Sequence, residues 1–271
     1  MGNTSAMKKF SLFILFIAIG LNGQDNNESI VSPKVLDEHA FKVGEYLKYT
    51  IDYGILSAGY AELAIEKKSK KEGKWTYHMS GYGRTTGVTE WAFRTRDYYD
   101  TYISETDLLP VEFIRDVDEG GYLIDRHVYF NHENLTAKDT KLDIDSSLAI
   151  NPGAQDLLSA FYYLRCLDVS DLKKGDKIQL TIFMDHENYP FQLKYLGKET
   201  VKIDAGKVKC LKFIPVVQDG RVFRDEESIT LWVSDDENKI PVYIKAKLKV
   251  GSVKVRLDAY KNLKSTLTFE S

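Results

Sequence analysis

The sequence predicts a mainly β protein, with antiparallel curved sheet(s) of roughly a dozen strands and one central helix near 155–167. Three observations lead to this fold class. Apolar and polar residues alternate with a period of two over most of the chain, short glycine-containing turns separate the alternating runs, and a single segment repeats every 3.6 residues instead. The 271 residues are 43% hydrophobic and 28% charged, as in an ordinary folded protein.

The first 23 residues have the organisation of a secretory signal peptide. Two lysines precede an apolar run at residues 10–21, and Gly23 supplies a small residue at the expected cleavage point. A helix of that length is about 18 Å long, too short for a hydrocarbon core of ~30 Å. The residues before Met7 are consistent with a misassigned start. We expect an exported protein, periplasmic or outer-membrane-associated, with no transmembrane segment in the mature chain; because no cysteine follows the run, we expect no lipoprotein.

Residues 24–39 are polar and aperiodic, which is typical of a flexible lead-in. Residues 40–271 are expected to form a single β-rich domain, because no linker rich in proline, glycine or serine divides them. Alternating runs typical of half-buried antiparallel strands lie at 47–53, 61–65, 242–250 and 253–257. Hairpin turns are predicted at 120–121, 205–206 and 251–252, and a charged connection at 67–74.

One segment departs from the period of two and predicts the central helix. In LLSAFYYLRCL, Leu157, Phe161 and Leu164 share a face at 3.6-residue spacing. Gln155-Asp156 opens the segment and Pro152-Gly153 precedes it, so a helix of about three turns fits.

Composition and motifs argue against several function classes. The 37 Lys+Arg and 40 Asp+Glu leave a small net charge, which gives no reason to expect nucleic acid as a partner. The chain has no G-x-S-x-G, H-E-x-x-H, C-x-x-C or Walker motif. We interpret the glycines at 81, 83 and 87 as a bulge or turn, and the two Asx-His-Glu-Asn tetrapeptides at 131–134 and 185–188 as polar turns. No catalytic residue, cofactor or metal site is therefore predicted.

Cys166 and Cys210 are the two cysteines of the sequence. In an oxidising compartment a bridge between them would close a loop of about 44 residues. The alternative is a pair of small buried thiols. One cysteine lies in the predicted helix and the other in a predicted strand, so the local pattern leaves both possibilities open.

Aromatic residues make up 12% of the chain, and those with polar tips suit half-wet concave walls as well as cores. The residues expected on inward strand faces include Leu47, Tyr49, Ile51, Leu63, Ile65, Trp91 and Phe93. Either the second β half covers this face completely, or a groove remains that an acyl chain could fill. The candidates for contact with such a ligand are Tyr49, Tyr53, Trp91, Phe93 and Arg165. Arg165 alternatively has a structural role, pairing with Asp168 or Asp171 at the helix end.

Two segments carry a resemblance to a known family. The first is F-x-x-G-E-x-L-x-Y at residues 41–49, and the second is Y-Y-L-R at residues 162–165. With generic strand sequence around them, they make the chain from about 41 to 269 resemble domain of unknown function 3108 (DUF3108), an exported bacterial family. The resemblance implies an envelope protein of Gram-negative, Bacteroidota-type bacteria and supplies no catalytic residue. In these motifs we expect Gly44 and Gly59 to use positive φ.

For function, the sequence favours a non-enzymatic protein that binds an amphiphilic ligand or another envelope component. The alternatives are a hydrolase with a dispersed site, in which His78, His127 or His186 stands beside an Asp or Glu, and a structural subunit of an envelope complex. A converging acid–histidine pair in a cleft would favour the enzyme. An apolar groove without titratable pairs would favour the binding protein.

Overall fold

The computed structural model describes residues 29–142, 147–216, 229–248 and 250–270; the expected signal peptide at 1–23 lies outside them. The described strands are β1 (Ile30–Val31), β2 (Tyr46–Tyr53), β3 (Leu56–Lys71), β4 (Lys74–Thr85), β5 (Thr95–Ser104), β6 (Pro110–Glu119), β7 (Tyr122–Asn131), β8 (Thr136–Asp139), β9 (Leu148–Ala149), β10 (Lys177–Met184), β11 (Glu187–Ile203), β12 (Gly206–Pro215), β13 (Ile229–Ser234), β14 (Pro241–Lys247) and β15 (Ser252–Lys261). The described helices are α1 (Gly87–Ala92) and α2 (Leu157–Arg165). Neither is long and apolar enough to cross a membrane.

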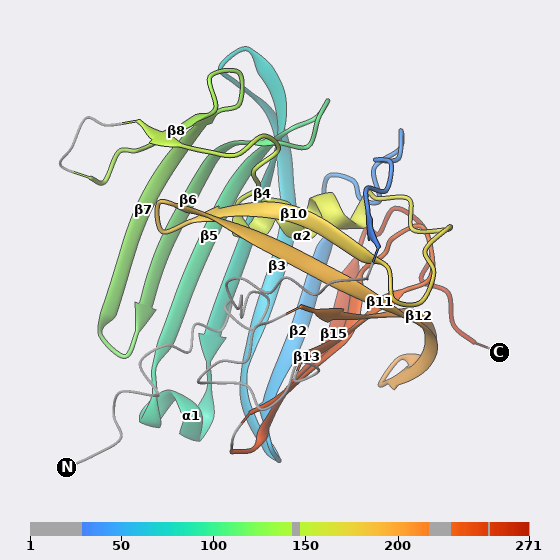
Figure 1. The fold of residues 1–271 in the computed structure, drawn as a ribbon. Coiled ribbons are helices and arrows are strands. Elements are labelled where there is room, and N and C mark those ends of the chain that lie inside the picture. The colour runs from blue at the N-terminus through green and yellow to red at the C-terminus, as the bar shows by residue number, and fades with distance from the viewer. Residues whose placement is uncertain (1–28, 143–146, 217–228, 249, 271) are drawn as a thin grey trace.

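All fifteen strands belong to one sheet, in the order β1-β10-β11-β12-β13-β14-β15-β2-β3-β4-β5-β6-β7-β8-β9. Strand β1 pairs with β10 in parallel, and every other neighbouring pair is antiparallel. The last strand, β15, lies beside β2, so the two β-rich parts of the sequence form one continuous surface. Figure 1 shows this surface curving strongly, and its edge strands β1 and β9 do not pair with each other.

The structure confirms the mainly β fold with a central helix. In β2, the predicted alternation places Leu47, Tyr49 and Ile51 inside, each no more than 4% exposed. The predicted helix is α2, which lies inside the curve of the sheet and contacts β4, β5 and β10 (Figure 1). Because side chains alternate along a strand and the sheet curves, one face of these strands turns towards the helix.

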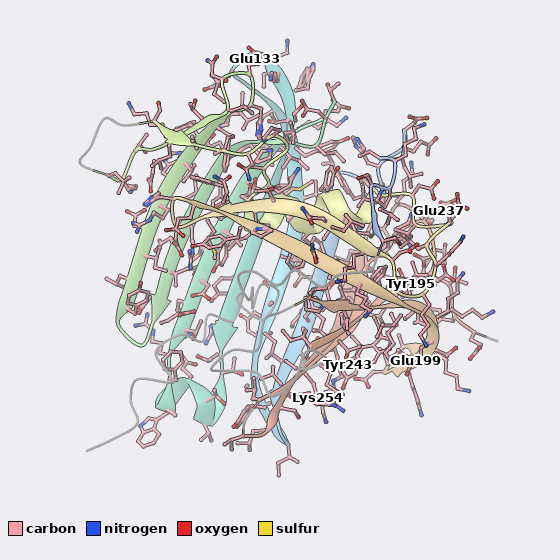
Figure 2. The ribbon with its side chains drawn as sticks, in the orientation of Figure 1. Glu133, Tyr195, Glu199, Glu237, Tyr243 and Lys254 are labelled. Atoms are coloured by element: carbon pink, nitrogen blue, oxygen red, sulfur yellow. The ribbon has the colours of Figure 1, made fainter. Side chains whose placement is uncertain are left out.

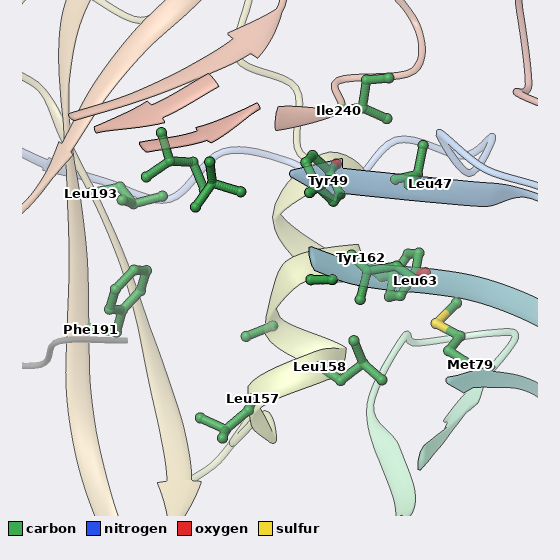
Figure 3. Packing of buried hydrophobic residues seen from close by; sticks show 14 of the residues in the cluster. Leu47, Tyr49, Leu63, Met79, Leu157, Leu158, Tyr162, Phe191, Leu193 and Ile240 are labelled. Atoms are coloured by element: carbon green, nitrogen blue, oxygen red, sulfur yellow. The ribbon is translucent and has the colours of Figure 1, made fainter. Parts of the chain in front are cut away.

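Part of the core lies between α2 and the inner faces of β2–β4. Leu158 and Tyr162 of α2 are fully buried, and Figure 3 shows them beside Leu63 of β3 and Met79 of β4. Burying side chains of this size contributes about 1.5–3 kcal/mol each. This packing occupies the helix face that looks towards the N-terminal strands and leaves the opposite face for another contact.

Three segments differ from the sequence predictions. The charged connection at 67–74 is mostly strand, because β3 and β4 continue to pair until a two-residue turn at Glu72-Gly73, where both residues have positive φ. The glycine-containing stretch at 81–87 ends in the short helix α1, which displaces Trp91 from the expected inward strand face. The lead-in at 24–39 includes β1, which adds to the sheet edge.

Candidate functional site

Helix α2 is fixed at its start by a buried carboxylate. The Asp156 side chain accepts hydrogen bonds from the backbone N–H groups of Leu158 and Ser159, both at 2.8 Å. It also accepts the Thr101 hydroxyl of β5 at 2.6 Å, while the Ser159 hydroxyl accepts the Asp156 N–H. This capping box satisfies the free N–H groups of the first turn and attaches the helix to the sheet. Burial raises the pKa of Asp156 to about 6, although its hydrogen bonds oppose the shift.

We expect this carboxylate to make stability fall as pH rises. A folded-state pKa of about 6, above the ordinary 3.8, means that the folded protein binds more protons between these values. The contribution is therefore fully present below about pH 4 and is lost by about pH 7, a change of about 3 kcal/mol. In Asp156→Asn, the uncharged amide oxygen can still accept the N–H groups of Leu158 and Ser159. In urea unfolding, the free energy of unfolding of the variant, relative to that of the wild type, should increase by about 3 kcal/mol from about pH 4 to about pH 7. A gap that does not change with pH would contradict the prediction.

The end of α2 is fixed by a buried ion pair. The Arg165 guanidinium donates to both Glu45 oxygens, at 2.6 and 2.8 Å, and to the backbone oxygens of Ala40 and Asn238, each at 3.0 Å. Arg165 is 3% exposed and Glu45 is 1% exposed. Burial alone would lower the pKa of Arg165, but the adjacent Glu45 carboxylate outweighs it and raises that pKa. The sequence suggested Asp168 or Asp171 as the partner of Arg165. The structure shows that the partner is instead Glu45, which lies just before β2.

The remaining face of α2 borders an apolar groove. Its opposite walls are the inner faces of β10–β14, and the groove is open to water on one side. Figure 3 shows Phe191 and Leu193 of β11 across from Leu157 of the helix. The described apolar lining is Leu157, Ala160, Phe161, Leu164, Val169, Ile178, Ile182, Phe191, Leu193, Leu211, Phe213, Pro215, Ile229, Leu231, Val233, Pro241 and Ile244.

Two charged residues, Arg165 and Lys239, complete the described lining of the groove. The Arg165 charge is already neutralised by Glu45. Lys239 forms no ion pair within the described ranges, and its φ of 44° belongs to the tight turn that leads into β14. The groove therefore offers a long apolar wall and one available positive charge, which suits an acyl chain with an anionic head.

Of the residues predicted from sequence to contact a ligand, Arg165 lies in the groove wall. Tyr49 is 1% exposed and packs in the core beside α2. Tyr53, Trp91 and Phe93 lie elsewhere: Tyr53 ends β2, Trp91 is 90% exposed on α1, and Phe93 packs against Gly120 at the β6–β7 turn. The structure does not bring these five residues together.

Sequence reasoning missed the groove walls of β10–β14. Their alternation was visible in the sequence, for example at Ile229, Leu231 and Val233. Alternation shows that such residues share a face, but it does not show that the facing helix leaves this face partly uncovered.

The two cysteines are buried free thiols in the structure. Cys166 caps the end of α2, and Cys210 lies in β12. Burial raises the pKa of both thiols, that of Cys210 to about 12. Both therefore remain protonated and unreactive at neutral pH.

Three histidines have acidic partners, as the hydrolase alternative requires. His78 bonds Asp100 at 2.6 Å, and His127 bonds Glu112 at 2.8 Å. His186, in the β10–β11 turn, bonds the buried Asp139 of β8 at 2.8 Å. None of the three lines the apolar groove, and none has a serine, threonine or cysteine hydrogen-bonded to its ring among the contacts of the described residues.

The carboxylates around His186 also bind neighbouring strands and so hold the fold together. Asp139 also accepts the backbone N–H groups of His127 and Lys141, and the neighbouring Asp185 accepts Arg115 at 3.1 Å. The His186–Asp139 and Arg115–Asp185 contacts attach the tip of the β10–β11 hairpin to β6–β8. Within the described residues, no group of three His, Cys, Asp or Glu side chains is arranged to hold a metal ion.

The family model described as "Protein of unknown function (DUF3108)" matches residues 48–258. The chain belongs to the DUF3108 family. The matched range includes all of α2 with Arg165 and every groove strand, and it begins three residues after Glu45. The resemblance inferred from the two sequence segments is thereby confirmed. Among curated proteins, no sequence matches this DUF3108 chain.

Solved structures of low sequence identity are similar to this chain to different degrees. A beta-barrel-like protein of domain of unknown function DUF1849 from Brucella abortus is 13% identical; the alignment covers 83% of this chain and 100% of that one, with a TM-score of 0.55. A candidate lipoprotein from Parabacteroides distasonis is 10% identical over 83% and 100% of the chains, with a TM-score of 0.35. A candidate exported protein from Bacteroides fragilis is 8% identical over 85% and 100%, with a TM-score of 0.34. Of these three, the Brucella protein has a TM-score above 0.5 and supports the fold.

Proposed function

We propose that this DUF3108 protein is an exported, non-enzymatic binding protein that holds the apolar part of an amphiphile in the groove between α2 and β10–β14. The observation that carries the proposal is the groove lining, in which seventeen of nineteen described residues are apolar. Apolar walls open to water favour occupation by an apolar ligand. The leader-like residues 7–23 support export, and the periplasm is the compartment that we propose.

Lys239 indicates the charge of the ligand's head group and the end of the groove where that group lies. Arg165 is held by Glu45 and two carbonyl oxygens, so it has little capacity for a further anion. Lys239 forms no ion pair in the part of the chain that the structure describes. We therefore infer an acyl chain with an anionic head, such as a fatty-acid carboxylate, near Lys239. Each buried methylene contributes about 0.8 kcal/mol, so a ten-carbon chain can reach micromolar affinity after the cost of association.

A fluorescent fatty-acid probe, displaced by unlabelled fatty acid, tests the groove. We expect Leu231→Trp to weaken probe binding about tenfold or more, because the larger side chain fills the space beside a half-buried wall residue. Thr230→Trp is the matched control: it adds the same ring one position earlier on β13, on the opposite face, and should leave the affinity unchanged.

The same displacement experiment also tests whether Lys239 binds the anionic head group. Lys239→Met should weaken displacement by a fatty acid about two- to fivefold and leave displacement by the corresponding fatty alcohol unchanged. No probe binding by folded wild-type protein at tens of micromolar would remove the proposal. Equal losses in Leu231→Trp and Thr230→Trp would show that the probe binds elsewhere.

A further inference from the structure

One end of the sheet carries large apolar side chains that stand out into water. The antiparallel order places the β2–β3 turn, the α1 connection, the β6–β7 turn and the β14–β15 turn at the same end, which is the lower edge in Figure 1. We call the exposed apolar residues of these four connections the apolar rim: Tyr53, Ile55, Leu56, Val88, Trp91, Tyr122, Leu123 and Val250. Ile55 is 100% exposed and Trp91 is 90% exposed.

The four connections touch one another in a row, so the rim is continuous. The Tyr53 hydroxyl donates to the Val250 oxygen at 2.9 Å, which joins the β2–β3 and β14–β15 turns. The Thr86 N–H donates to the Ala58 oxygen at 2.9 Å, which holds α1 beside β3. The Gly120 N–H donates to the Arg94 oxygen at 2.7 Å and joins the α1 connection to the β6–β7 turn.

The arginines next to the rim all have acidic partners, although two of them share one glutamate. Arg84 and Arg96 both bind Glu90 of α1, and Arg94 lies 3.3 Å from Asp118. The opposite end of the sheet is polar, and Figure 2 shows Glu133 there, far from Lys254 near the rim. The turn between β3 and β4 at that end contains Lys70, Lys71, Glu72 and Lys74. The molecule therefore has an apolar end and a charged end along the strand direction.

We propose that the apolar rim inserts into the interfacial layer of a lipid bilayer. Trp and Tyr with aliphatic residues are the composition that favours this layer. The side chains protrude singly from separate turns, which suits insertion between lipid head groups more than docking against a rigid protein surface. Because the arginines beside the rim have acidic partners, we expect apolar area to supply most of the binding and salt to have the smaller effect. The proposal rests on the rim alone and stands whether or not the groove holds a ligand.

Flotation of the full chain with vesicles of phosphatidylethanolamine and phosphatidylglycerol tests this. We expect the double variant Ile55→Ser/Trp91→Ser to bind about a hundredfold more weakly, roughly tenfold for each side chain removed from the lipid. Trp75→Ser is the matched control, because Trp75 is 53% exposed at the charged end, and it should bind as the wild type does. The apolar run at residues 10–21 is the same in every variant, so the difference between them reports the rim. Both sites are exposed, and circular dichroism checks that each variant is folded.

Fluorescence gives a local measurement, since the chain has three tryptophans and Trp232 is buried. In Trp75→Phe, bromine-labelled acyl chains should quench the remaining exposed Trp91; in Trp91→Phe, Trp75 should not be quenched. Equal binding by the rim and control variants, or no quenching of Trp91 in vesicle-bound protein, would overturn the proposal. A third result would also overturn it: the wild type does not bind vesicles but self-associates in sedimentation, and Ile55→Ser/Trp91→Ser abolishes the self-association. The rim would then be covered by a second copy of the protein and not by lipid.

Discussion

Arg165→Met is expected to lower the free energy of unfolding by about 3–5 kcal/mol. The substitution leaves the Glu45 carboxylate, 1% exposed, without its countercharge. It also removes the N–H donors that now bond the backbone oxygens of Ala40 and Asn238. Each of these groups would then be buried without a hydrogen-bond partner, which lowers the free energy of unfolding. Urea unfolding followed by circular dichroism measures the loss through the shift of the midpoint.

The double variant Glu45→Met/Arg165→Met is the control. With both charges removed, the desolvation cost of the carboxylate disappears, so the double variant should be more stable than Arg165→Met alone. Arg165→Lys should lie between the wild type and Arg165→Met, because lysine keeps the charge but cannot make the two parallel bonds to Glu45. A loss below about 1 kcal/mol for Arg165→Met, or losses that simply add in the double variant, would show that the pair contributes little.

This ion pair joins the two sequence segments on which the family resemblance was based. The two segments that carried it, at 41–49 and 162–165, contain Glu45 and Arg165, respectively, and the fold brings them together. Sequence alone suggested the nearby Asp168, because a charged partner within a few residues is the simplest choice. In the structure Asp168 instead accepts the hydroxyl and N–H of Ser170. A pair separated by 120 residues leaves no periodic signal, so its partner could not be predicted.

The fold class was predictable because it depends on local pattern. The hairpin at 120–121 has the predicted two-residue turn, with both glycines at positive φ. The turn predicted at 251–252 is longer and lies between Lys247 and Ser252, which pair with each other, although Gly251 does have positive φ. Helix α2 follows from its 3.6-residue spacing and its Asp156 cap. The strand order was not predictable, because β15 joins β2 by hydrogen bonds between distant segments. Helix α1 was missed, since it buries no residue and so has no amphipathic pattern.

The groove was foreseen as an alternative, but its position was not. Alternation marks Tyr49 as inward-facing, and the structure buries it. Whether an inward face is covered depends on where α2 lies across the curved sheet. The helix packs on β4 and β5, which leaves the groove between it and the strands β10–β14. Pattern within one strand cannot show this, because it arises from the spacing of elements that are distant in sequence.

Gly59→Ala is expected to lower the free energy of unfolding by about 3 kcal/mol or more. The sequence suggested that Gly59 is needed for positive φ, but it is absent from the residues with that conformation, unlike Gly44 at φ 85°. Its role is close approach: a Cβ atom at Gly59 would lie 2.1 Å from the backbone oxygen of Arg84 in β4. A backbone atom cannot move aside as a flexible side chain can, so β3 and β4 must separate at this point.

Thermal unfolding compares this variant with Gly54→Ala as the matched control. Gly54 lies five residues earlier in the β2–β3 turn, has φ 61°, and a Cβ there would meet no atom within 4 Å. Gly54→Ala therefore adds only left-handed backbone strain of about 1–2 kcal/mol. Separation of β3 from β4 should also weaken the bond from Thr86 to Ala58, so amide exchange at Thr86 should speed up in Gly59→Ala and stay unchanged in Gly54→Ala. If the two variants lose equal stability, the close approach of β4 is not the reason for glycine at this position.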